Sequence, residues 1–383
     1  MNQGIGRLRC AWRLWLERSL PTSSGNSKLL PGGSEDVKVL VIGGTGTIGS
    51  FVTQELWKRG CEVTLLVRGL SRRVFPNEPG VSVIHGDRKN ISLLQAVAEH
   101  NFDVVVDLAC YEPQDAEAAV QTFAGRIEQY LFVSTVDVYT KPAAVYPVTE
   151  DAERNPRKSF AYAWKKAQCE EVFFKAHREK RFAVTIIRPA HTYCEGVTPL
   201  LQVFGWTTDH LDRIQKGKPV IIHGDGTSLW SSLYAEDLAV PLANALLTPL
   251  AYGKAYNIAS EEVMCWNRLY EIVADVMGMP LRPVYVPAKV LGQAFPRKAL
   301  WCVENFQYSN VFSVGLAKKD LGFATRTSYG DGVLRCLRWF AENGGFDDSD
   351  SPRFDFYERF LRAWETSMRS LTETLVRSTG IVE

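Results

Sequence analysis

The first part of the chain alternates short apolar runs with segments that have helical periodicity. Residues 37–43 read Val-Lys-Val-Leu-Val-Ile-Gly, and a run this apolar predicts a strand that is buried on both faces. In the segment 47–59, apolar residues recur every three or four positions, which predicts an amphipathic helix. Because strands that alternate with helices form βαβ units, the pattern predicts an α/β fold, a Rossmann-type doubly wound parallel sheet. The alternation continues with strands at 62–67, 81–85, 103–108, 129–134 and 183–188, and with helices at 91–99, 114–124 and 162–179.

The rhythm changes after the strand at 183–188, where segments rich in aromatic residues and proline take over. A strand at 220–223, a helix at 237–247 and a strand at 255–258 are predicted there, and mostly helical segments follow. We therefore expect a second, smaller α/β lobe, mainly C-terminal, that holds the substrate. The expected regions are an N-terminal extension at 1–36, a Rossmann domain at 37–190, a substrate lobe at 191–345 of which 237–260 returns to the Rossmann domain, and a C-terminal helical extension at 346–383.

A glycine-rich loop follows the first predicted strand and opens the first predicted helix. Its sequence, Gly43-Gly44-Thr45-Gly46-Thr47-Ile48-Gly49, has the spacing G-x-x-G-x-x-G. Gly43 permits the tight turn, Gly46 lets the backbone approach a pyrophosphate, and Gly49 lets the helix pack close to the strand. Backbone N–H groups at the helix N-terminus then bind the phosphates, so the loop predicts a dinucleotide site. The alternative, a structural turn with incidental glycines, is disfavoured by the βαβ context. Expected contacts from this loop are Gly43, Thr45, Gly46, Thr47, Ile48 and Gly49.

The residues after the second strand predict which nicotinamide cofactor is bound. NAD sites usually carry an acidic residue there for the ribose 2′-hydroxyl, whereas arginine accommodates the 2′-phosphate of NADP. Here the strand is followed by Arg68, Arg72 and Arg73, and no carboxylate occurs before Glu78. We therefore expect NADP in preference to NAD, with the alternatives that Arg68 stacks on the adenine or faces solvent. Further cofactor contacts are expected from residues that follow other strands, namely Asp87, Arg88, Leu108, Ala109, Pro189 and His191.

The sequence Tyr162-Ala163-Trp164-Lys165-Lys166 places a tyrosine and a lysine four residues apart. On a helix, two side chains with this spacing lie on the same face. A free tyrosine has a pKa of ~10, and a nearby cation together with the positive nicotinamide ring favours the phenolate. We expect Tyr162 to exchange a proton with a substrate hydroxyl or carbonyl during hydride transfer. Lys166 is expected to lower the pKa of Tyr162 and to bind the ribose hydroxyls of the cofactor.

Several further segments resemble motifs of the extended (atypical) short-chain dehydrogenases/reductases, in the NAD-dependent epimerase/dehydratase family. They read Phe-Val-Ser-Thr-Val-Asp-Val-Tyr at 132–139, Arg-Pro-Ala-His-Thr-Tyr at 188–193, Gly-Asp-Gly-Thr-Ser-Leu-Trp at 224–230, Glu-Asp-Leu-Ala at 236–239 and Lys-Lys-Asp-Leu-Gly-Phe at 318–323. The resemblance covers roughly residues 37–340 of the chain. It implies a nicotinamide cofactor and makes Thr135 the hydroxyl residue that binds the reacting oxygen.

Two positions differ from what the resemblance implies for nucleotide-sugar enzymes. The resemblance implies an arginine for the diphosphate where Trp230 stands, and an acidic residue where Val136 stands in the 4,6-dehydratases. Dehydration by that mechanism is therefore not expected. Tyr111, Asp137 and Trp230 are the candidate substrate contacts. Asp137 is either a substrate base or a capping residue, and Trp230 either stacks on a ring or belongs to the core.

Two hypotheses of function follow. The first is an NAD(P)-dependent oxidoreductase or epimerase that acts on a secondary alcohol or ketone of a sugar derivative or small metabolite. Its catalytic residues are Thr135, Tyr162 and Lys166. The second is a non-catalytic NAD(P)-binding sensor or an RNA-binding relative of the same fold. The intact tyrosine–lysine pair favours the first hypothesis, and a formal net charge of +1 argues against nucleic acid as a partner.

Composition adds expectations about metals, partners and location. The eight cysteines form no C-x-x-C pair, which predicts reduced thiols and no metal site. No apolar stretch is long enough to predict a membrane span. Residues 1–36 are rich in arginine, so they are either a disordered or surface-packed extension or a mitochondrial targeting segment. We expect a cytoplasmic location, with mitochondria as the alternative, and the resemblance implies a homodimer as one alternative for the oligomeric state.

Overall fold

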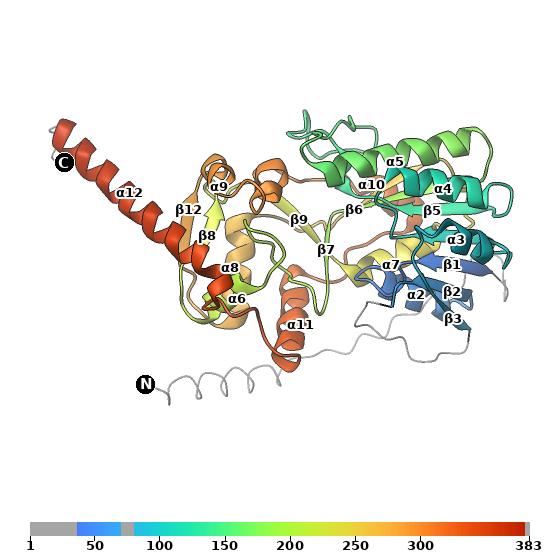
Figure 1. Ribbon diagram of the computed structural model, residues 1–383, viewed down its shortest axis with the longest axis horizontal. Helices are drawn as coiled ribbons and strands as arrows, with labels where there is room; N and C mark the ends of the chain where they lie inside the picture. The colour runs from blue at the N-terminus through green and yellow to red at the C-terminus, as the bar shows by residue number, and fades with distance from the viewer. Residues whose placement is uncertain (1–36, 70–79, 380–383) are drawn as a thin grey trace.

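The structure, a computed structural model, describes residues 37–69 and 80–379 and has two lobes (Figure 1). The N-terminal extension, and Arg72 and Arg73, which contributed to the expectation of NADP, lie outside the described residues. One lobe is built on a seven-stranded parallel sheet with the order β10-β6-β5-β4-β1-β2-β3. Its strands are β1 (Lys38–Ile42), β2 (Glu62–Val67), β3 (Val81–His85), β4 (Val104–Asp107), β5 (Gln129–Val133), β6 (Ala183–Pro189) and β10 (Ala255–Ile258).

The central strands are buried on both faces, as their unbroken apolar sequences require. In β1, Val39 and Val41 belong to one hydrophobic cluster, and Leu40 and Ile42 belong to another. This alternation reflects the two-residue period of a strand, and it lets helices cover both faces of the sheet. The first cluster includes residues of α2 (Gly49–Lys58), α7 (Ala235–Asn244) and α10 (Gly315–Leu321). The second includes residues of α3 (Ile91–Ala98), α4 (Pro113–Phe123) and α5 (Ala161–Arg178).

The other lobe has its own hydrophobic core and contains two small sheets. In one, β9 (Leu229–Tyr234) lies between β7 (His191–Tyr193) and β11 (Val263–Cys265), and in the other β8 (Val220–His223) pairs with β12 (Pro283–Val286). The predicted fold class, a Rossmann-type parallel sheet with a smaller, mainly C-terminal α/β lobe, is confirmed. The helices of this lobe are α6 (Asp209–Gln215), α8 (Trp266–Met277), α9 (Ala288–Ala294) and α11 (Tyr329–Glu342), and one turn of π-helix spans Cys302–Phe306.

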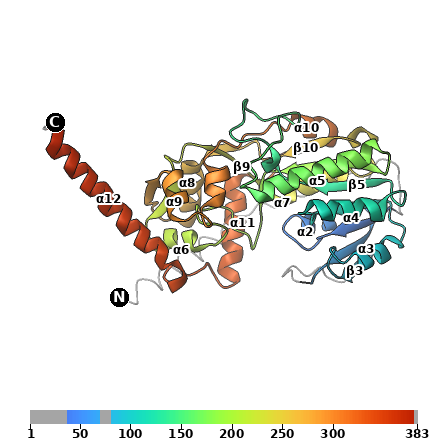
Figure 2. The same ribbon diagram turned by 45° about the horizontal axis from the view of Figure 1, so that its top comes forward.

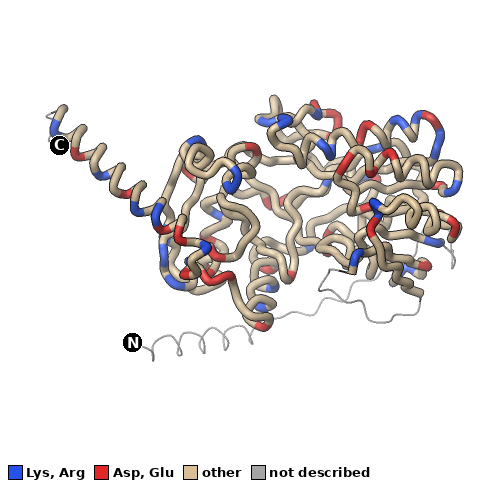
Figure 3. The backbone as a smooth tube through the Cα atoms, viewed as in Figure 1, with Lys and Arg blue, Asp and Glu red and all other residues tan. Residues whose placement is uncertain are grey.

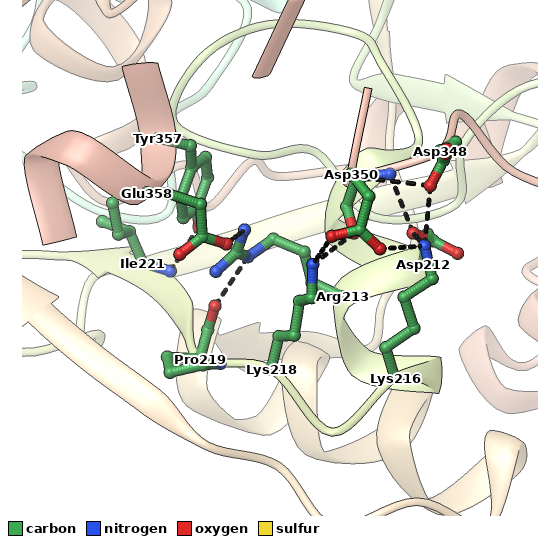
Figure 4. A network of polar contacts seen from close by, with 11 residues as sticks. Asp212, Arg213, Lys216, Lys218, Pro219, Ile221, Asp348, Asp350, Tyr357 and Glu358 are labelled. Carbon is green, nitrogen blue, oxygen red and sulfur yellow. Dashed lines mark hydrogen bonds and ion pairs between the residues drawn. The ribbon is translucent and has the colours of Figure 1, made fainter. Parts of the chain in front are cut away.

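The last helix, α12 (Asp355–Thr379), begins on the second lobe and extends well beyond it, as Figures 1 and 2 show. Its first turns are held by polar contacts with α6 and β8 (Figure 4). The Arg213 guanidinium, which is fully buried, lies 2.7 Å from Glu358 and donates to the carbonyl of Pro219. The hydroxyl of Tyr357 accepts from the backbone N–H of Ile221. These contacts fix the start of α12 on the lobe.

Candidate active site

A cavity of about 700 Å³ lies where the two lobes meet, and residues from both lobes line it. Its floor is formed by the carboxyl ends of the parallel strands, where Ile42 ends β1, Val67 ends β2 and Pro189 ends β6. In the sheet, β1 lies between β2 and β4, so the chain winds in opposite directions from this point. Crevices at such a switch point are where doubly wound sheets bind ligands. The cavity volume is within the range of small-molecule and cofactor sites.

The glycine loop lines one end of this cavity, which we call the cofactor half. Gly43 has φ +85°, a conformation that favours glycine, and its N–H donates to the carbonyl of Leu66 at 3.0 Å. A Cβ at Gly49 would lie 2.3 Å from the carbonyl oxygen of Gly43, so only glycine lets α2 start this close to β1. A Cβ at Gly46 would meet only that oxygen, at 3.5 Å. Thr45, Thr47 and Ile48 also line the cavity, and the cradle therefore fits a dinucleotide phosphate.

The adenine end differs from expectation in one respect. Arg68 and Asp87 are exposed and line the cavity, as a contact with the cofactor requires. Arg88 also lines it, but its guanidinium is buried and lies 3.0 Å from Asp107 and 3.3 Å from Asp115. The Arg88 side chain therefore serves as a structural counter-ion, and only its backbone is available to a cofactor. The remaining expected positions, Leu108, Ala109, Pro189 and His191, all line the cavity.

The predicted catalytic residues lie together beside the cavity. Tyr162 and Lys166 are on α5, and Thr135 immediately follows β5 and caps the 3₁₀ turn Val136–Val138. The Thr135 hydroxyl is close enough to the phenol of Tyr162 to lower its pKa. The Lys166 ammonium is 2% exposed and donates to the carbonyls of Cys110, at 2.9 Å, and Val133, at 2.7 Å. The structure thus brings together a phenol, a hydroxyl and an oriented ammonium from two neighbouring elements.

The protein's own groups raise the pKa of Tyr162. Burial raises the pKa of Tyr162 above its ordinary value, the carboxylate of Asp137 and the phenol of Tyr111 raise it further, and the Thr135 hydroxyl lowers it. The ammonium of Lys166 donates to two carbonyls and lies 4.4 Å from the ring centre of Phe132. Burial lowers the pKa of Lys166 itself. The protein groups alone therefore keep Tyr162 protonated.

The other end of the cavity, the substrate half, is lined by Asp137, His191, Trp206, Trp230, Trp301 and Asn305. Of the predicted substrate contacts, Tyr111 lines the cavity and is 50% exposed, so it is accessible. Trp230 also lines it but is only 4% exposed, and its ring packs against Trp266 and Phe306 with centroids at 5.0 and 5.3 Å. Trp230 is therefore mainly a core residue with an edge at the cavity.

Asp137 belongs to a buried cluster that sequence reasoning did not find. One carboxylate oxygen accepts from the Lys141 ammonium and from the amide of Asn305, both at 2.9 Å. The other lies 3.3 Å from the Thr135 hydroxyl. Lys141 also donates to the side-chain oxygens of Asn305 and Asn310, so its ammonium has three acceptors. A carboxylate bound in this way is a structural counter-ion rather than a free base, and the cluster connects Thr135 to the second lobe.

His191 and two tryptophans form an aromatic wall in the substrate half. The rings of Trp206 and Trp301 meet edge to face at 5.4 Å, and Trp301 lies 5.4 Å from the ring of Tyr162. His191 lies 6.0 Å from Trp206, and its Nδ1 is 3.2 Å from the hydroxyl of Ser232. Its Nε2 is buried and has no hydrogen-bond partner among the described residues. Neither tryptophan was predicted, because both lie in segments without a recognisable motif.

Other predicted absences concern metals, disulfides and membrane spans. Among the described residues, no group of three His, Cys, Asp or Glu side chains could hold a metal ion. The seven described cysteines are all free thiols. Within residues 37–69 and 80–379, no helix is both long and apolar enough to cross a membrane.

Comparison with known proteins identifies the family of this site. A sequence model of the NAD dependent epimerase/dehydratase family matches residues 39–259. The chain is 29% identical over 320 residues to 2'-dehydrokanamycin reductase of Streptomyces kanamyceticus, which covers 82% of this chain and 88% of that protein. It is 27% identical to the chloroplast stem-loop binding protein of 41 kDa b of Arabidopsis thaliana, over 64% of this chain and 65% of that protein.

The fold agrees with that assignment. UDP-glucose 4-epimerase from Thermotoga maritima superposes with a TM-score of 0.65 at 21% identity, covering 80% of this chain and 99% of that one. The glycine cradle, Thr135, Tyr162 and Lys166 line one cavity. The chain belongs to the NAD-dependent epimerase/dehydratase family of extended short-chain dehydrogenases/reductases, whose members are NAD(P)-dependent enzymes.

Proposed function

We propose that this protein catalyses NAD(P)-dependent oxidation or reduction at a secondary alcohol or ketone of a small substrate. The observation that carries the proposal is that Thr135, Tyr162 and Lys166 line the same cavity as the glycine cradle. When bound, the nicotinamide supplies or accepts the hydride. An epimerase would use the same residues, but it returns the hydride to the oxidised substrate and keeps its cofactor. A reductase or dehydrogenase releases the cofactor after each turnover, so cofactor release distinguishes the two kinds of enzyme.

The chain's own residues have distinct tasks in this chemistry. Tyr162 donates a proton to the substrate oxygen during reduction and removes it during oxidation. Thr135, which lines the cavity beside Tyr162, orients the same oxygen. Lys166, fixed by two backbone carbonyls, presents its remaining N–H to the ribose hydroxyls of the cofactor. Because the protein groups keep Tyr162 protonated, deprotonation during oxidation relies on the positive charge that the bound oxidised cofactor brings.

We also propose NADP as the preferred cofactor. Arg68 directly follows β2, is exposed and lines the cofactor half, where an arginine accommodates a 2′-phosphate. The Arg68→Ala variant should weaken NADPH binding by roughly 10- to 100-fold and leave NADH binding unchanged, because a single charge-assisted hydrogen bond contributes roughly 1.5–3 kcal/mol. Fluorescence titration of both cofactors measures this ratio. Equal losses for the two cofactors would contradict a role at the 2′-phosphate.

The catalytic proposal is tested by removing one oxygen atom. Tyr162→Phe should lower the turnover of NADPH with ketone substrates by roughly 100-fold or more, the usual size of general acid/base catalysis. NADPH affinity should stay unchanged, because the phenol is not part of the cradle. Tyr252→Phe is the matched control, since the Tyr252 hydroxyl binds Glu128 rather than lining the cavity. Undiminished turnover in Tyr162→Phe would refute the mechanism.

The RNA-binding alternative is disfavoured by the distribution of charge. Lys and Arg are interspersed with Asp and Glu over both lobes (Figure 3), and the sequence carries a net charge of +1. Binding to RNA depends mainly on neutralising phosphates with a basic surface. One relative is a chloroplast stem-loop binding protein, so a filter-binding assay with a stem-loop RNA is a useful check. Tight, salt-sensitive binding would favour this alternative.

A further inference from the structure

We propose that the substrate half of the cavity binds a phosphate-free ring polyol, such as a glycoside or a cyclitol, and not a nucleoside diphosphate sugar. This inference rests on the proposed function, because it names the substrate class of the same site. Three observations support it: the position of the cations, the aromatic wall and one buried nitrogen without a partner.

The cations lie at the wrong end of the cavity for a diphosphate sugar. The described residues that line the cavity include four with positive side chains, Arg68, Arg88, Lys89 and Lys166. Arg68, Arg88 and Lys89 follow β2 and β3, in the cofactor half, and Lys166 is bound by backbone carbonyls beside the catalytic tyrosine. None of the described residues that line the substrate half is Lys or Arg. Because a buried phosphate anion needs charged or N–H partners, a second diphosphate would be poorly held there.

The nearest further cation does not fill this role. The ammonium of Lys141 already donates to the side-chain oxygens of Asp137, Asn305 and Asn310. Asp137 and Lys141 together carry no net charge, so the cluster offers an incoming phosphate no uncompensated positive charge. Freeing Lys141 for a phosphate would leave the Asp137 carboxylate buried with less compensation, which costs several kcal/mol. The substrate half therefore disfavours anions and tolerates neutral or cationic ligands.

The aromatic wall fits one face of a ring. Trp206 is 50% exposed, and its ring lies 5.4 Å from that of Trp301, which in turn lies beside Tyr162. An exposed tryptophan ring that lines a cavity offers an apolar face that the C–H bonds of a ligand ring can cover. A substrate ring that packs on Trp206 lies beside Trp301 and Tyr162, so that one of its hydroxyl groups can reach the catalytic phenol. This arrangement favours a cyclic substrate over an extended one.

His191 supplies the polar contact that a hydroxylated ring needs. Burial lowers the pKa of His191 to about 3, so the imidazole is neutral at physiological pH. Nδ1 contacts Ser232, whereas the buried Nε2 has no partner among the described residues, and such atoms usually have a ligand or water as partner. The hydroxyl of Ser134, which also lines the cavity, is likewise buried without a partner in the described part of the chain. Two such groups favour a polyol over a purely apolar ligand.

Calorimetric titration of the full chain saturated with NADP tests this assignment. The probes are methyl glucoside, myo-inositol and kanamycin as phosphate-free ring polyols, and UDP-glucose as the diphosphate sugar. We expect saturable binding of at least one ring polyol and at least ~10-fold weaker binding of UDP-glucose, the effect of an uncompensated buried charge. Tighter binding of UDP-glucose than of every ring polyol would overturn the assignment, and so would failure of all three ring polyols to bind.

Single substitutions test whether the polyol binds at the aromatic wall and at His191. Trp206→Ala and His191→Phe should each weaken the bound polyol by about 5- to 10-fold, the loss expected for one aromatic contact or one buried hydrogen bond. Trp364→Ala, on α12 and outside the cavity lining, is the matched control and should bind normally. Unchanged affinity in both wall variants would overturn the assignment. NADPH titration and the Tyr162→Phe turnover test are independent of these outcomes, so failure of the substrate class is distinguishable from failure of the proposed function.

Discussion

The two halves of the cavity are built by different means. The core of the cofactor half is one stretch of chain, residues 42–49, in which glycines and the N-terminus of α2 expose backbone to the cavity. The substrate half consists of side chains from segments far apart in sequence, such as Asp137, Trp206 and Asn305. Backbone contacts recognise what all dinucleotides share, whereas side chains can change without disturbing the fold. The difference explains why the family and cofactor are evident from this chain while its substrate requires further argument.

The largest effect is expected in the cofactor half, at Gly49. In Gly49→Ala, the new Cβ would lie 2.3 Å from the carbonyl oxygen of Gly43 and 2.8 Å from the backbone of Gly44, so the turn must shift. We expect NADPH affinity to fall by about 100-fold or more, together with a loss of roughly 3 kcal/mol in the free energy of unfolding. Fluorescence titration and urea denaturation measure the two effects.

Two glycine controls separate packing from binding. In Gly46→Ala, the nearest atom to the new Cβ is 3.5 Å away, so stability should be kept while the phosphate approach is hindered. Gly330→Ala, on α11 with a nearest contact at 4.0 Å, should change neither property. If Gly49→Ala bound NADPH as the native protein does, the backbone description of the cofactor half would be wrong.

The next largest effect is expected at a buried ion pair behind the catalytic helix. Arg188, on β6, binds both oxygens of Glu170 on α5 at 3.0 and 2.8 Å, and the two side chains are 1% and 0% exposed. In Arg188→Met, the Glu170 carboxylate keeps only Arg154, at 2.7 Å, among the described residues. The hydroxyl of Tyr139 and the carbonyl of Glu150 also lose a donor, and together these losses should cost about 3 kcal/mol of unfolding free energy. Urea denaturation tests this value. Lys165→Met, which breaks a half-exposed pair with Glu112, should cost no more than ~1 kcal/mol, and a similar cost for both variants would contradict the burial argument.

The sequence predicted local parts of this site much better than distant ones. The glycine loop and the Tyr162–Lys166 pair are each contained in a few residues, so spacing alone identifies them. The Lys141 cluster joins side chains 164 and 169 residues apart, and only the packing of the two lobes brings them together. Trp206 and Trp301 gave no signal for the same reason. The sequence indicated Asp137 as a candidate but not its partner Lys141. The sequence alone therefore could not distinguish a counter-ion from a base at Asp137.

The Arg88 and Lys166 assignments show a second limit of sequence patterns. Both residues were expected to face the cofactor, and both line the cavity. The Arg88 side chain is nevertheless bound to Asp107 and Asp115, and the Lys166 ammonium to two carbonyls. A pattern specifies which residue stands at a position, whereas the partners of its charge depend on tertiary packing. Electrostatic roles are therefore the least predictable part of such a site.

A smaller effect, on pH dependence, is expected at Lys141. The Lys141 ammonium compensates Asp137, whose carboxylate raises the pKa of Tyr162. In Lys141→Met, no ammonium compensates the Asp137 carboxylate, so the pKa of Tyr162 rises further. Oxidation requires the phenolate of Tyr162, so the rise of the oxidation rate with pH shifts to higher pH. We expect a shift of about half a pH unit. The pH profile of kcat/KM in the oxidation direction measures it.

A double variant distinguishes charge from structure at this cluster. Asp137→Asn combined with Lys141→Met removes both charges, so the pH profile should return toward that of the native protein. A purely structural role would instead make the double variant at least as impaired as Lys141→Met, with no reversal of the shift. Absence of reversal would therefore show that the cluster does not tune Tyr162.

The smallest effect is expected at the second arginine–glutamate pair, where α12 begins (Figure 4). Arg213 is fully buried like Arg188, but Glu358 is 40% exposed and its charge is largely solvated when the pair is broken. In Arg213→Met, the Glu358 carboxylate that remains is therefore solvated, and the carbonyl of Pro219 loses one donor. The free energy of unfolding should fall by about 1 kcal/mol, the usual cost of one hydrogen bond together with an exposed charge pair. A urea midpoint lowered as much as in Arg188→Met would show that burial of the carboxylate is not what separates the two pairs.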